Sequence, residues 1–245
     1  IQSLPDALAG RLEPGVVRTE SPVTAVDLRE KVARVQGLGE VHYERLVNTL
    51  PLNVFLDLAT PLPADVKAAR GDLRWNTVWN LNVGIDRPAP ADKHWIYYPE
   101  KRFPFYRVGF SSNFSPNLAP EGHAALYLEA ARPGGARVDR DKLEAAMIKG
   151  LREAGLLRRS DEISAKIWMP VPVGYVVYDR ARTPAVDVIF RHFTALGVES
   201  IGRYGGWKYS FMEETILDGK RCADRLTGAA AAPEASPAVP LQALK

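Results

Sequence analysis

The sequence predicts an α+β fold: an antiparallel mixed sheet with helices set among its strands, followed by a closing strand and helix. Strand-like segments rich in aromatic and β-branched residues come in runs, and helical patterns separate these runs. Hydrophobic residues occupy 46% of the 245 positions, which is enough for one large core or two modest cores. We therefore expect a sheet with helices covering one of its faces.

The first part of the chain, 1–55, predicts a small helix and a β-meander. Residues 4–12 have helical spacing and end before a Glu-Pro-Gly sequence. Residues 22–51 alternate apolar and polar side chains, with reversals expected at an Arg-Glu and a Gly-Leu-Gly sequence. A loop and a short helix follow over 58–73.

The middle of the chain, 56–194, predicts one domain built on a sheet. Its first four strands are expected at 75–85, 94–99, 105–112 and 123–131. A helix over 139–157 carries apolar residues on one face. A strand over 164–179 is interrupted by two prolines, and a Thr-Pro sequence opens a helix over 183–196.

The closing part, 195–227, predicts a strand, a glycine-rich turn and a helix. Ser210 and Glu213 have the spacing of a capping box, in which each side chain bonds the backbone N–H of the other residue. The inner face of this helix is expected to hold Met212, Ile216, Gly219, Ala223 and Leu226. The tail, 228–245, has low complexity, and we expect it to be flexible.

Composition excludes several classes of function. The formal charge of +3 comes from 32 basic and 29 acidic residues spread along the chain, which leaves no basic block for nucleic acid. The single cysteine, Cys222, forms no internal disulfide, so we expect a cytoplasmic protein. The sequence has no apolar run of about 18 to 20 residues that would span a membrane. The histidines are scattered, so we expect no metal site, and we assign no catalytic side chain.

A glycine-aromatic turn, "GRYGGWKYS", precedes the last helix. Gly202, Gly205 and Gly206 allow tight or positive-φ geometry and leave backbone N–H groups uncovered by side chains. The helix N-terminus behind the turn carries about half a positive charge, which suits an anionic or electron-rich ligand atom. The alternative is a plain strand-turn-helix packing unit that holds no ligand.

A second group of polar residues lies in the sequence "HWIYYPEKRFPFYR". If the two strands reverse around Arg102, antiparallel pairing places Tyr97 opposite Arg107. The guanidinium and the phenol could then hold a phosphate or carboxylate group together. A cation–π or surface pair is the alternative.

These segments resemble a known family of flavoproteins. The sequences "WIYYPEKRFPFYRVGFSSNFSP", "PVGYVVYD" and "GRYGGWKYSFMEE" are similar to segments of the eukaryotic-type UDP-galactopyranose mutases and their bacterial relatives. Those enzymes belong to the wider FAD-dependent amine oxidase and protoporphyrinogen oxidase-like superfamily. The resemblance runs through nearly the whole chain except the tail. It implies that 1–55 is part of an FAD-binding domain, that 56–194 binds substrate, and that 195–227 closes the FAD domain.

The resemblance also implies roles for particular residues in substrate binding. Tyr97 and Arg107 fall where the mutases hold the substrate diphosphate, and Tyr175 and Tyr209 match two further phosphate-binding tyrosines. Phe114 stands where the mutases have a tyrosine, so one hydroxyl donor is lost. The implied substrate is a small molecule, a UDP-sugar in the mutases.

A further set of residues is implied to contact FAD. The turn and the head of the last helix border the flavin in the superfamily, which points to Arg203, Gly205, Met212 and Glu213. Val23, in the opening "VTAVDL" segment, is placed beside the cofactor in the same way. Glu213 stands where the mutases have an asparagine, and its carboxylate would repel a diphosphate unless the capping box turns it away.

The dinucleotide-binding pattern G-x-G-x-x-G occurs nowhere in the chain, so the sequence resembles the C-terminal half of these enzymes. Alone, such a half should bind FAD weakly and lack activity. Mutase chemistry would need reduced flavin and give no net redox change, whereas an oxidase or desaturase would pass a hydride to the flavin, with Arg107 binding a carboxylate. The remaining alternatives are a non-catalytic binding domain, a homo-oligomer, and one subunit of a flavoprotein whose N-terminal half is a separate chain.

Overall fold

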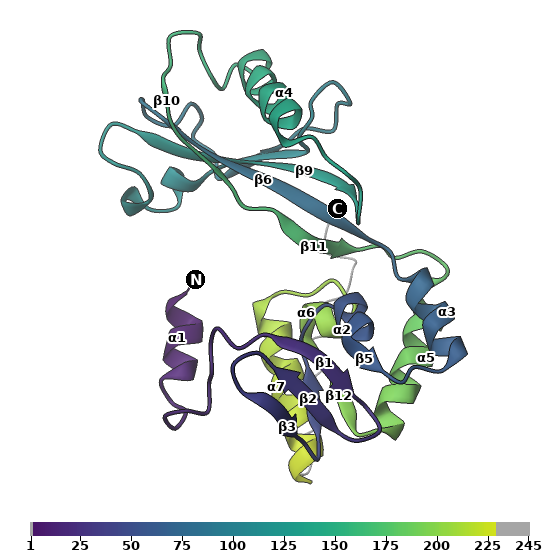
Figure 1. The fold of residues 1–245 in the computed structure, drawn as a ribbon. Coiled ribbons are helices and arrows are strands. Elements are labelled where there is room, and N and C mark those ends of the chain that lie inside the picture. The colour runs from purple at the N-terminus through teal and green to yellow at the C-terminus, as the bar shows by residue number, and fades with distance from the viewer. Residues whose placement is uncertain (1, 229–245) are drawn as a thin grey trace, which may run out of the picture. The chain divides into compact units, whose positions relative to one another are not determined.

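The computed structural model describes residues 2–228, which form two compact units (Figure 1). The second unit is Leu73–Arg182, and the first holds the described residues up to Asp72 and from Thr183 onward. The second unit begins later and ends earlier in the sequence than the predicted middle domain, 56–194. All but the first residue of the predicted flexible tail, 228–245, lies outside the described residues.

The second unit is a six-stranded antiparallel sheet. Its strands are β6 (Trp75–Ile85), β7 (Trp95–Tyr97), β8 (Arg107–Phe110), β9 (Ala124–Pro133), β10 (Ile163–Trp168) and β11 (Val171–Val176). They lie in the order β10-β6-β9-β8-β7, and β11 also pairs with β6. The predicted strands are therefore present, and β6 has the predicted bounds. Two short 3-10 turns, Ser111–Asn113 and Pro116–Leu118, connect β8 to β9.

One face of this sheet is covered by α4 (Arg140–Glu153), as the sequence predicted (Figure 1). The Asp139 side chain caps the helix by accepting a hydrogen bond from the Lys142 backbone N–H at 3.1 Å. The buried residues Leu143, Met147 and Leu151 recur at helical spacing and pack on the strands. The sheet side of this core includes Leu81, Val83, Val108, Phe110, Leu126 and Leu128.

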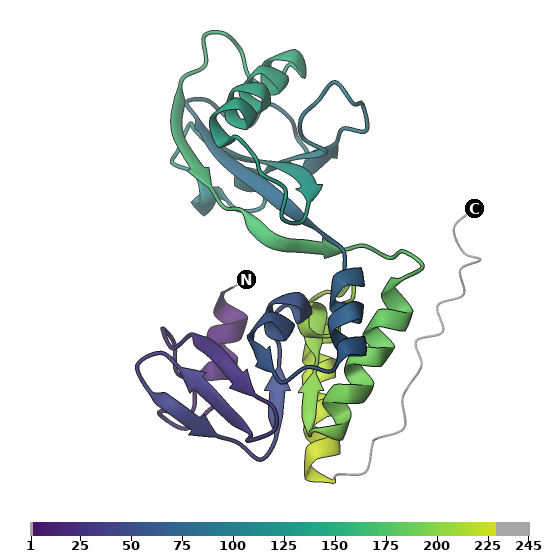
Figure 2. The same ribbon diagram turned by 45° about the vertical axis from the view of Figure 1, so that its right-hand side comes forward.

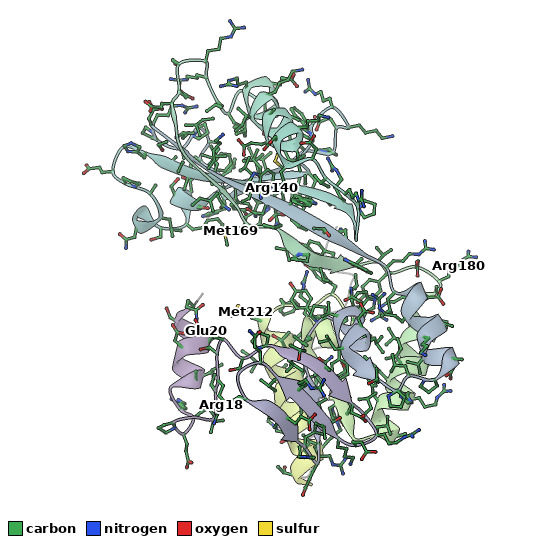
Figure 3. The ribbon with its side chains drawn as sticks, viewed as in Figure 1. Arg18, Glu20, Arg140, Met169, Arg180 and Met212 are labelled. Atoms are coloured by element: carbon green, nitrogen blue, oxygen red, sulfur yellow. The ribbon has the colours of Figure 1, made fainter. Side chains whose placement is uncertain are left out.

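The opposite face of the sheet carries polar and aromatic side chains, because successive residues of a strand point to opposite faces. We call it the polar face, and register places on it Asn80, Asn82, Trp95, Tyr97, Arg107, Gly109, Tyr127 and Glu129. Met169 lies where β10 gives way to β11 and is 61% exposed (Figure 3).

The first unit contains two small sheets and most of the helices (Figure 2). Its elements before the second unit are α1 (Ser3–Ala9), β1 (Val23–Asp27), β2 (Val32–Val35), β3 (Gly39–His42), β4 (Leu46–Asn48), α2 (Leu52–Leu58), β5 (Ala59–Thr60) and α3 (Ala64–Asp72). After it come α5 (Arg182–Ala195), β12 (Val198–Ser200), α6 (Gly202–Gly205) and α7 (Met212–Thr227). The predicted meander is confirmed for β1, β2 and β3, which pair in antiparallel order.

Two features of the first unit differ from the sequence prediction. The fourth strand of the predicted meander, β4, leaves it and pairs in parallel with β12, about 150 residues away along the chain. The helix α2 was not predicted, because a seven-residue segment with five apolar residues fits a buried strand as well as a short helix. Its side chains Leu52, Phe55 and Leu56 are buried, so packing decides its structure.

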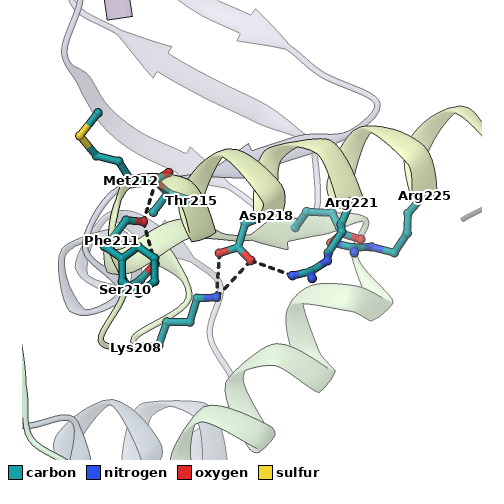
Figure 4. A network of polar contacts seen from close by, with 9 residues as sticks. Lys208, Ser210, Phe211, Met212, Thr215, Asp218, Arg221 and Arg225 are labelled. Atoms are coloured by element: carbon teal, nitrogen blue, oxygen red, sulfur yellow. Dashed lines mark hydrogen bonds and ion pairs between the residues drawn. The ribbon is translucent and has the colours of Figure 1, made fainter. Parts of the chain in front are cut away.

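The start of α7 corrects the predicted capping box. Phe211 is the N-cap residue, no side chain caps the helix, and Glu213 is exposed. The Ser210 hydroxyl donates instead to the Phe211 carbonyl oxygen at 3.3 Å (Figure 4). The box does not form because Ser210 lies one residue before the N-cap position.

The predicted inner face of α7 is also wrong. Met212, Ile216 and Leu226 are 44%, 48% and 38% exposed, whereas Cys222 is 2% exposed. Asp218, one turn before Cys222, accepts a hydrogen bond from the Lys208 ammonium at 3.1 Å (Figure 4). This ion pair joins the preceding turn to the helix, and α7 packs through the face that carries the partly buried Asp218 and the buried Cys222 thiol.

Candidate functional site

Tyr97 and Arg107 lie directly opposite each other on β7 and β8, which confirms the predicted register. Arg107 Nη1 donates a hydrogen bond to the Tyr97 hydroxyl at 3.3 Å. The guanidinium carbon also lies 5.7 Å from the centre of the Tyr97 ring, within cation–π range. The two candidate ligand-binding groups therefore meet on the polar face, as expected for strands that reverse around Arg102.

Glu129 is a third member of this group that the sequence analysis missed. It lies opposite Arg107 on β9 and is only 7% exposed. Arg107 Nη2 donates to Glu129 Oε1 at 2.7 Å, and the Tyr106 hydroxyl donates to Glu129 Oε2. The available signal was a lone carboxylate within the apolar strand "HAALYLEAA", because a buried charge needs a partner.

The electrostatics of the group keep its proton donors in fixed states. Burial disfavours the Arg107 cation, but the hydrogen bond and charge of Glu129 raise the pKa of its guanidinium above the usual value. Burial and the bond to Glu129 raise the pKa of Tyr106, and burial raises the pKa of Tyr127. Near neutral pH the group therefore offers one permanent cation and neutral phenols to a ligand.

Tyr127 depends on a glycine in the neighbouring strand. Gly109 lies opposite Tyr127, and a Cβ atom at Gly109 would sit 1.9 Å from the Tyr127 Cζ atom. The phenol ring therefore lies over the bare backbone of β8. In this position the Arg107 guanidinium lies 5.9 Å from the Tyr127 ring centre, so aromatic rings surround the cation.

The other predicted substrate residues lie in three places. Tyr175, on β11 opposite Asn76, is close enough to contribute to the raised pKa of Tyr106. Phe114 is 52% exposed and stacks at 6.2 Å on Trp95, two residues before Tyr97 on β7. Tyr209 belongs to the first unit and is 62% exposed. The second unit thus brings together Tyr97, Arg107 and Tyr175 and places Phe114 at a neighbouring aromatic surface.

The predicted cofactor residues are only partly gathered. A pocket of about 460 Å³ in the first unit lies at the glycine turn and the head of α7. Arg203 and Met212 line it, whereas Gly205, Glu213 and Val23 do not. The full lining is Thr49, Ile201, Gly202, Arg203, Tyr204, Ser210, Phe211, Met212, Thr215 and Gly219.

Gly205 has a structural reason to be glycine. A Cβ atom there would lie 2.6 Å from the Asn48 carbonyl oxygen, so only glycine allows α6 to approach β4 this closely. Arg203 Nη1 donates to the Ser210 carbonyl oxygen at 2.6 Å, which closes the turn. The close approach of α6 to β4 and the hydrogen bond across the turn therefore determine the shape of the pocket.

The chemistry of this pocket suits an uncharged ring better than a pyrophosphate. Ile201, Phe211 and Met212 supply apolar surface beside the bare backbone of Gly202, whose φ is +76°. Glu213 and Glu214 occupy the first turn of α7, where they complement the helix dipole and would repel an anion. The predicted use of this helix end for an anionic ligand atom is therefore not supported by the side chains of its first turn.

Residues 2–228 contain neither a cluster of metal ligands nor a helix that could span a membrane. These described residues contain no group of three or more His, Cys, Asp or Glu side chains that could hold a metal ion. Within the same range, no helix has the length and apolar character needed to cross a bilayer. Cys222 is buried, and burial raises the pKa of its thiol, so the structure gives it no sign of nucleophilic activation.

Comparison with solved structures shows a fold shared with a mutase and two oxidases. Reduced UDP-galactopyranose mutase is 22% identical with a TM-score of 0.85, over 93% of this chain and 51% of that chain. A candidate protoporphyrinogen oxidase from Exiguobacterium sp. 255-15 is 15% identical with a TM-score of 0.71, over 92% and 50%. A redesigned putrescine oxidase is 13% identical with a TM-score of 0.63, over 93% and 53%.

The chain therefore spans about half the length of the solved structures it matches. A family model described as flavin containing amine oxidoreductase matches residues 1–227. That match extends over both units, including the polar face and the glycine turn. The chain belongs to the family of flavin-containing amine oxidoreductases.

Proposed function

We propose that this chain is the C-terminal portion of an FAD-dependent enzyme, and that its second unit binds an anionic small-molecule substrate through Tyr97 and Arg107. The observation that carries the proposal is the paired geometry of these two side chains on the polar face. A planar guanidinium beside a neutral phenol can hold phosphate or carboxylate oxygens. Tyr175 supplies a further phenol in the same unit.

The first candidate substrate is a nucleotide sugar, as in a UDP-galactopyranose mutase-like reaction. The likeness to the mutase over nearly the whole chain supports this candidate, as do the positions of Tyr97, Arg107 and Tyr175. In this account these side chains bind and orient the diphosphate, and none of them forms a covalent bond. Phe114 would add an aromatic contact in the same unit, and Tyr209, in the first unit, stays a prediction for substrate contact.

The second candidate is an oxidase or desaturase-type reaction on a substrate that carries a carboxylate. The observation that favours it is the Arg107–Glu129 ion pair, with nitrogen and oxygen 2.7 Å apart. Glu129 already balances the charge of Arg107, so the pair attracts a dianion less strongly than a free arginine would. A ligand with one carboxylate would bind the Arg107 guanidinium beside Glu129. Its single charge fits the weaker attraction of this ion pair.

FAD would contribute its redox-active ring in either reaction, and Arg203 and Met212 are the lining residues that would hold the ring. Ile201 and Phe211 would exclude water from it. Gly205, Glu213 and Val23 stay predictions for cofactor contact. We expect the pyrophosphate of FAD to be held by groups outside this pocket, because Glu213 and Glu214 occupy the first turn of α7.

The first unit also presents apolar side chains without cover inside the described part of the chain. On α7 these include Met212, Ile216 and Leu226, and on α1 they include Leu4 and Leu8. Surfaces of this kind mark contacts with further protein. We propose that a flavin-binding portion covers them, either within one longer polypeptide or as a separate subunit. A homo-oligomer and a non-catalytic binding domain are the other outcomes to test.

Isothermal titration calorimetry with UDP, UDP-galactose and pyrophosphate tests the proposal. Arg107→Ala should weaken binding about 10-fold to 100-fold, because a hydrogen bond to a charged group contributes about 1.5–3 kcal/mol. Arg102→Ala is the matched control, since Arg102 is exposed in the same hairpin and lies over Phe103 instead. Equal affinity in the two variants would refute the assignment of Arg107.

The same titrations separate the candidate substrates. UDP-galactose binding more tightly than pyrophosphate would favour the nucleotide sugar. A further titration with a simple carboxylate tests the second candidate, which tighter binding of the carboxylate than of either ligand would favour. An absorbance scan of the purified chain for bound flavin tests the cofactor separately, with Met212→Lys as the variant that should lower any flavin content.

A further inference from the structure

An apolar groove of about 360 Å³ lies on the same sheet as the Arg107 group, between β6, β9, β10 and the segment before β9. A groove of this size falls within the range of small-molecule sites. Its lining consists of Asn82, Val83, Gly84, Leu118, Ala119, Pro120, His123, Ala124, Ala125, Leu126, Ser164, Ala165 and Ile167.

Strand register connects the groove to the polar face. Asn82, which lines the groove, lies directly opposite Tyr127 in the pairing of β6 with β9. On its other side Asn82 lies opposite Ile167 of β10, which also lines the groove. β8 and β6 are two strand spacings apart, and Arg107 is level with Asn80, two residues before Asn82 and four before Gly84. The Arg107 backbone therefore lies about 12 Å from Asn82, at the near end of the groove, and about 16 Å from Gly84. One elongated small molecule can reach both the Arg107 side chain and the groove.

The groove exists because small residues form its floor. Gly84, Ala125 and Ala165 occupy successive strands at one level of the sheet. A Cβ atom at Gly84 would lie 2.9 Å from the Ser164 hydroxyl oxygen and 3.3 Å from the Ala165 Cβ atom. Larger side chains at this level would fill the space.

The lining selects the chemistry of a ligand. Apolar side chains dominate it, and the groove contains no aspartate, glutamate, lysine or arginine among its described lining residues. Those residues also include no Phe, Tyr or Trp, and the aromatic ring among them is the His123 imidazole, which offers little stacking surface to a flat nucleobase. Aliphatic surface is the chemistry that this lining matches.

We propose that the groove is a subsite for an aliphatic group, carried by a molecule whose anionic end is held at Arg107. The inference rests on the proposed function in using Arg107 as the anchor, and it specifies the substrate class as an aliphatic carboxylate. Tyr127 and Asn82 form the surface between the anchor and the groove.

Methyl NMR titration of the full chain tests this subsite, with octanoate, butanoate and 1-octanol as probes. Each buried CH₂ group contributes about fourfold in affinity, which corresponds to about 0.8 kcal/mol. Octanoate should therefore bind at least about tenfold more tightly than butanoate and shift the methyl signals of Ala125 and Ile167. Equal affinities for the two acids would overturn the proposal.

Two substitutions on β9 provide the matched comparison. Ala125→Leu fills the groove and should remove the advantage of octanoate, whereas Ala131→Leu lies on the same strand and face outside the groove and should retain it. Thermal melts verify that both variants fold, and Ala165→Leu on β10 repeats the test from another strand. Loss of the advantage in Ala131→Leu as well would contradict a local subsite.

The variant Arg107→Ala separates this inference from the proposed function. It should weaken octanoate but leave 1-octanol unchanged. Arg107-dependent pyrophosphate binding without a chain-length effect would uphold the anchor and overturn the subsite. A chain-length effect with no Arg107 dependence for any probe would uphold the groove and overturn the anchor.

Discussion

Glu129 is the most informative residue of the polar face to substitute, because its buried carboxylate accepts hydrogen bonds from two neighbouring side chains. The substitution Glu129→Ala leaves the Arg107 guanidinium and the Tyr106 hydroxyl without their acceptor. Breaking a buried ion pair costs about 3–5 kcal/mol. The Glu129 and Arg107 side chains are 10% and 21% exposed, so solvent relieves part of this penalty and we expect about 3 kcal/mol.

The variant Glu129→Gln separates charge from hydrogen bonding. Its amide oxygen still accepts one of the two hydrogen bonds, but its amide nitrogen cannot accept the other, so one donor loses its acceptor at a cost of about 1–2 kcal/mol. The alanine variant should therefore be less stable than the glutamine variant. The control Glu153→Ala removes an exposed i,i+4 pair with Lys149 and should cost only about 0.3–0.5 kcal/mol.

Urea unfolding followed by tryptophan fluorescence measures these differences. Trp75, Trp79, Trp95 and Trp168 belong to the second unit, and Trp207 belongs to the first. The signal therefore reports mainly on the unit that contains Glu129. A two-unit protein can unfold in two steps, so each transition is fitted separately. A cost below about 1 kcal/mol for Glu129→Ala, or a larger cost for the glutamine variant, would refute the role of Glu129 as a buried shared acceptor.

Three further predictions follow from single contacts. Gly109→Ala should destabilise the second unit by about 1–3 kcal/mol, because the methyl group must displace the Tyr127 ring; urea unfolding measures the cost, and an unchanged midpoint would contradict the packing. The hydrogen bond from Lys166 lowers the pKa of Glu144, so this interaction stabilises the fold above the usual glutamate pKa and is lost as pH falls through the lowered value. The stability difference between wild type and Glu144→Gln should therefore shrink between about pH 5 and pH 3, and a difference that grows on acidification would contradict the assignment. Cys222 should react with a thiol reagent in urea but not in buffer over the same period, because its thiol is buried; equal rates would contradict that burial.

Local pattern was sufficient to predict the sheet of the second unit and one part of its site. The alternation in β6 defines the strand without help from distant residues, and the reversal between β7 and β8 sets the register of Tyr97 against Arg107. Both features depend on residues that are close together in the chain. The amphipathic pattern of α4 predicted its packed face for the same reason.

Long-range pairing and competing local interactions account for what the sequence did not predict. Glu129 meets Arg107 only because β9 lies beside β8, and no local spacing specifies that neighbour. The packed face of α7 is decided by Lys208 and Cys222, since an ion pair and a buried thiol outweigh the exposed apolar stripe in this part of the chain. The parallel pairing of β4 with β12 joins the two ends of the first unit, and the hydrophobic periodicity of neither segment predicts this partner.

The central claim is that an anionic ligand touches Arg107 on the polar face, and arginine-selective NMR tests it directly. Chain labelled at its arginine side chains would be titrated with UDP, pyrophosphate and octanoate. We predict that the Arg107 guanidinium signals shift with the same midpoint as the heat of binding for at least one of these ligands, while the signals of Arg102 stay unchanged. Calorimetric binding that leaves the Arg107 signals in place would contradict the assignment of Arg107 as the anion-binding residue.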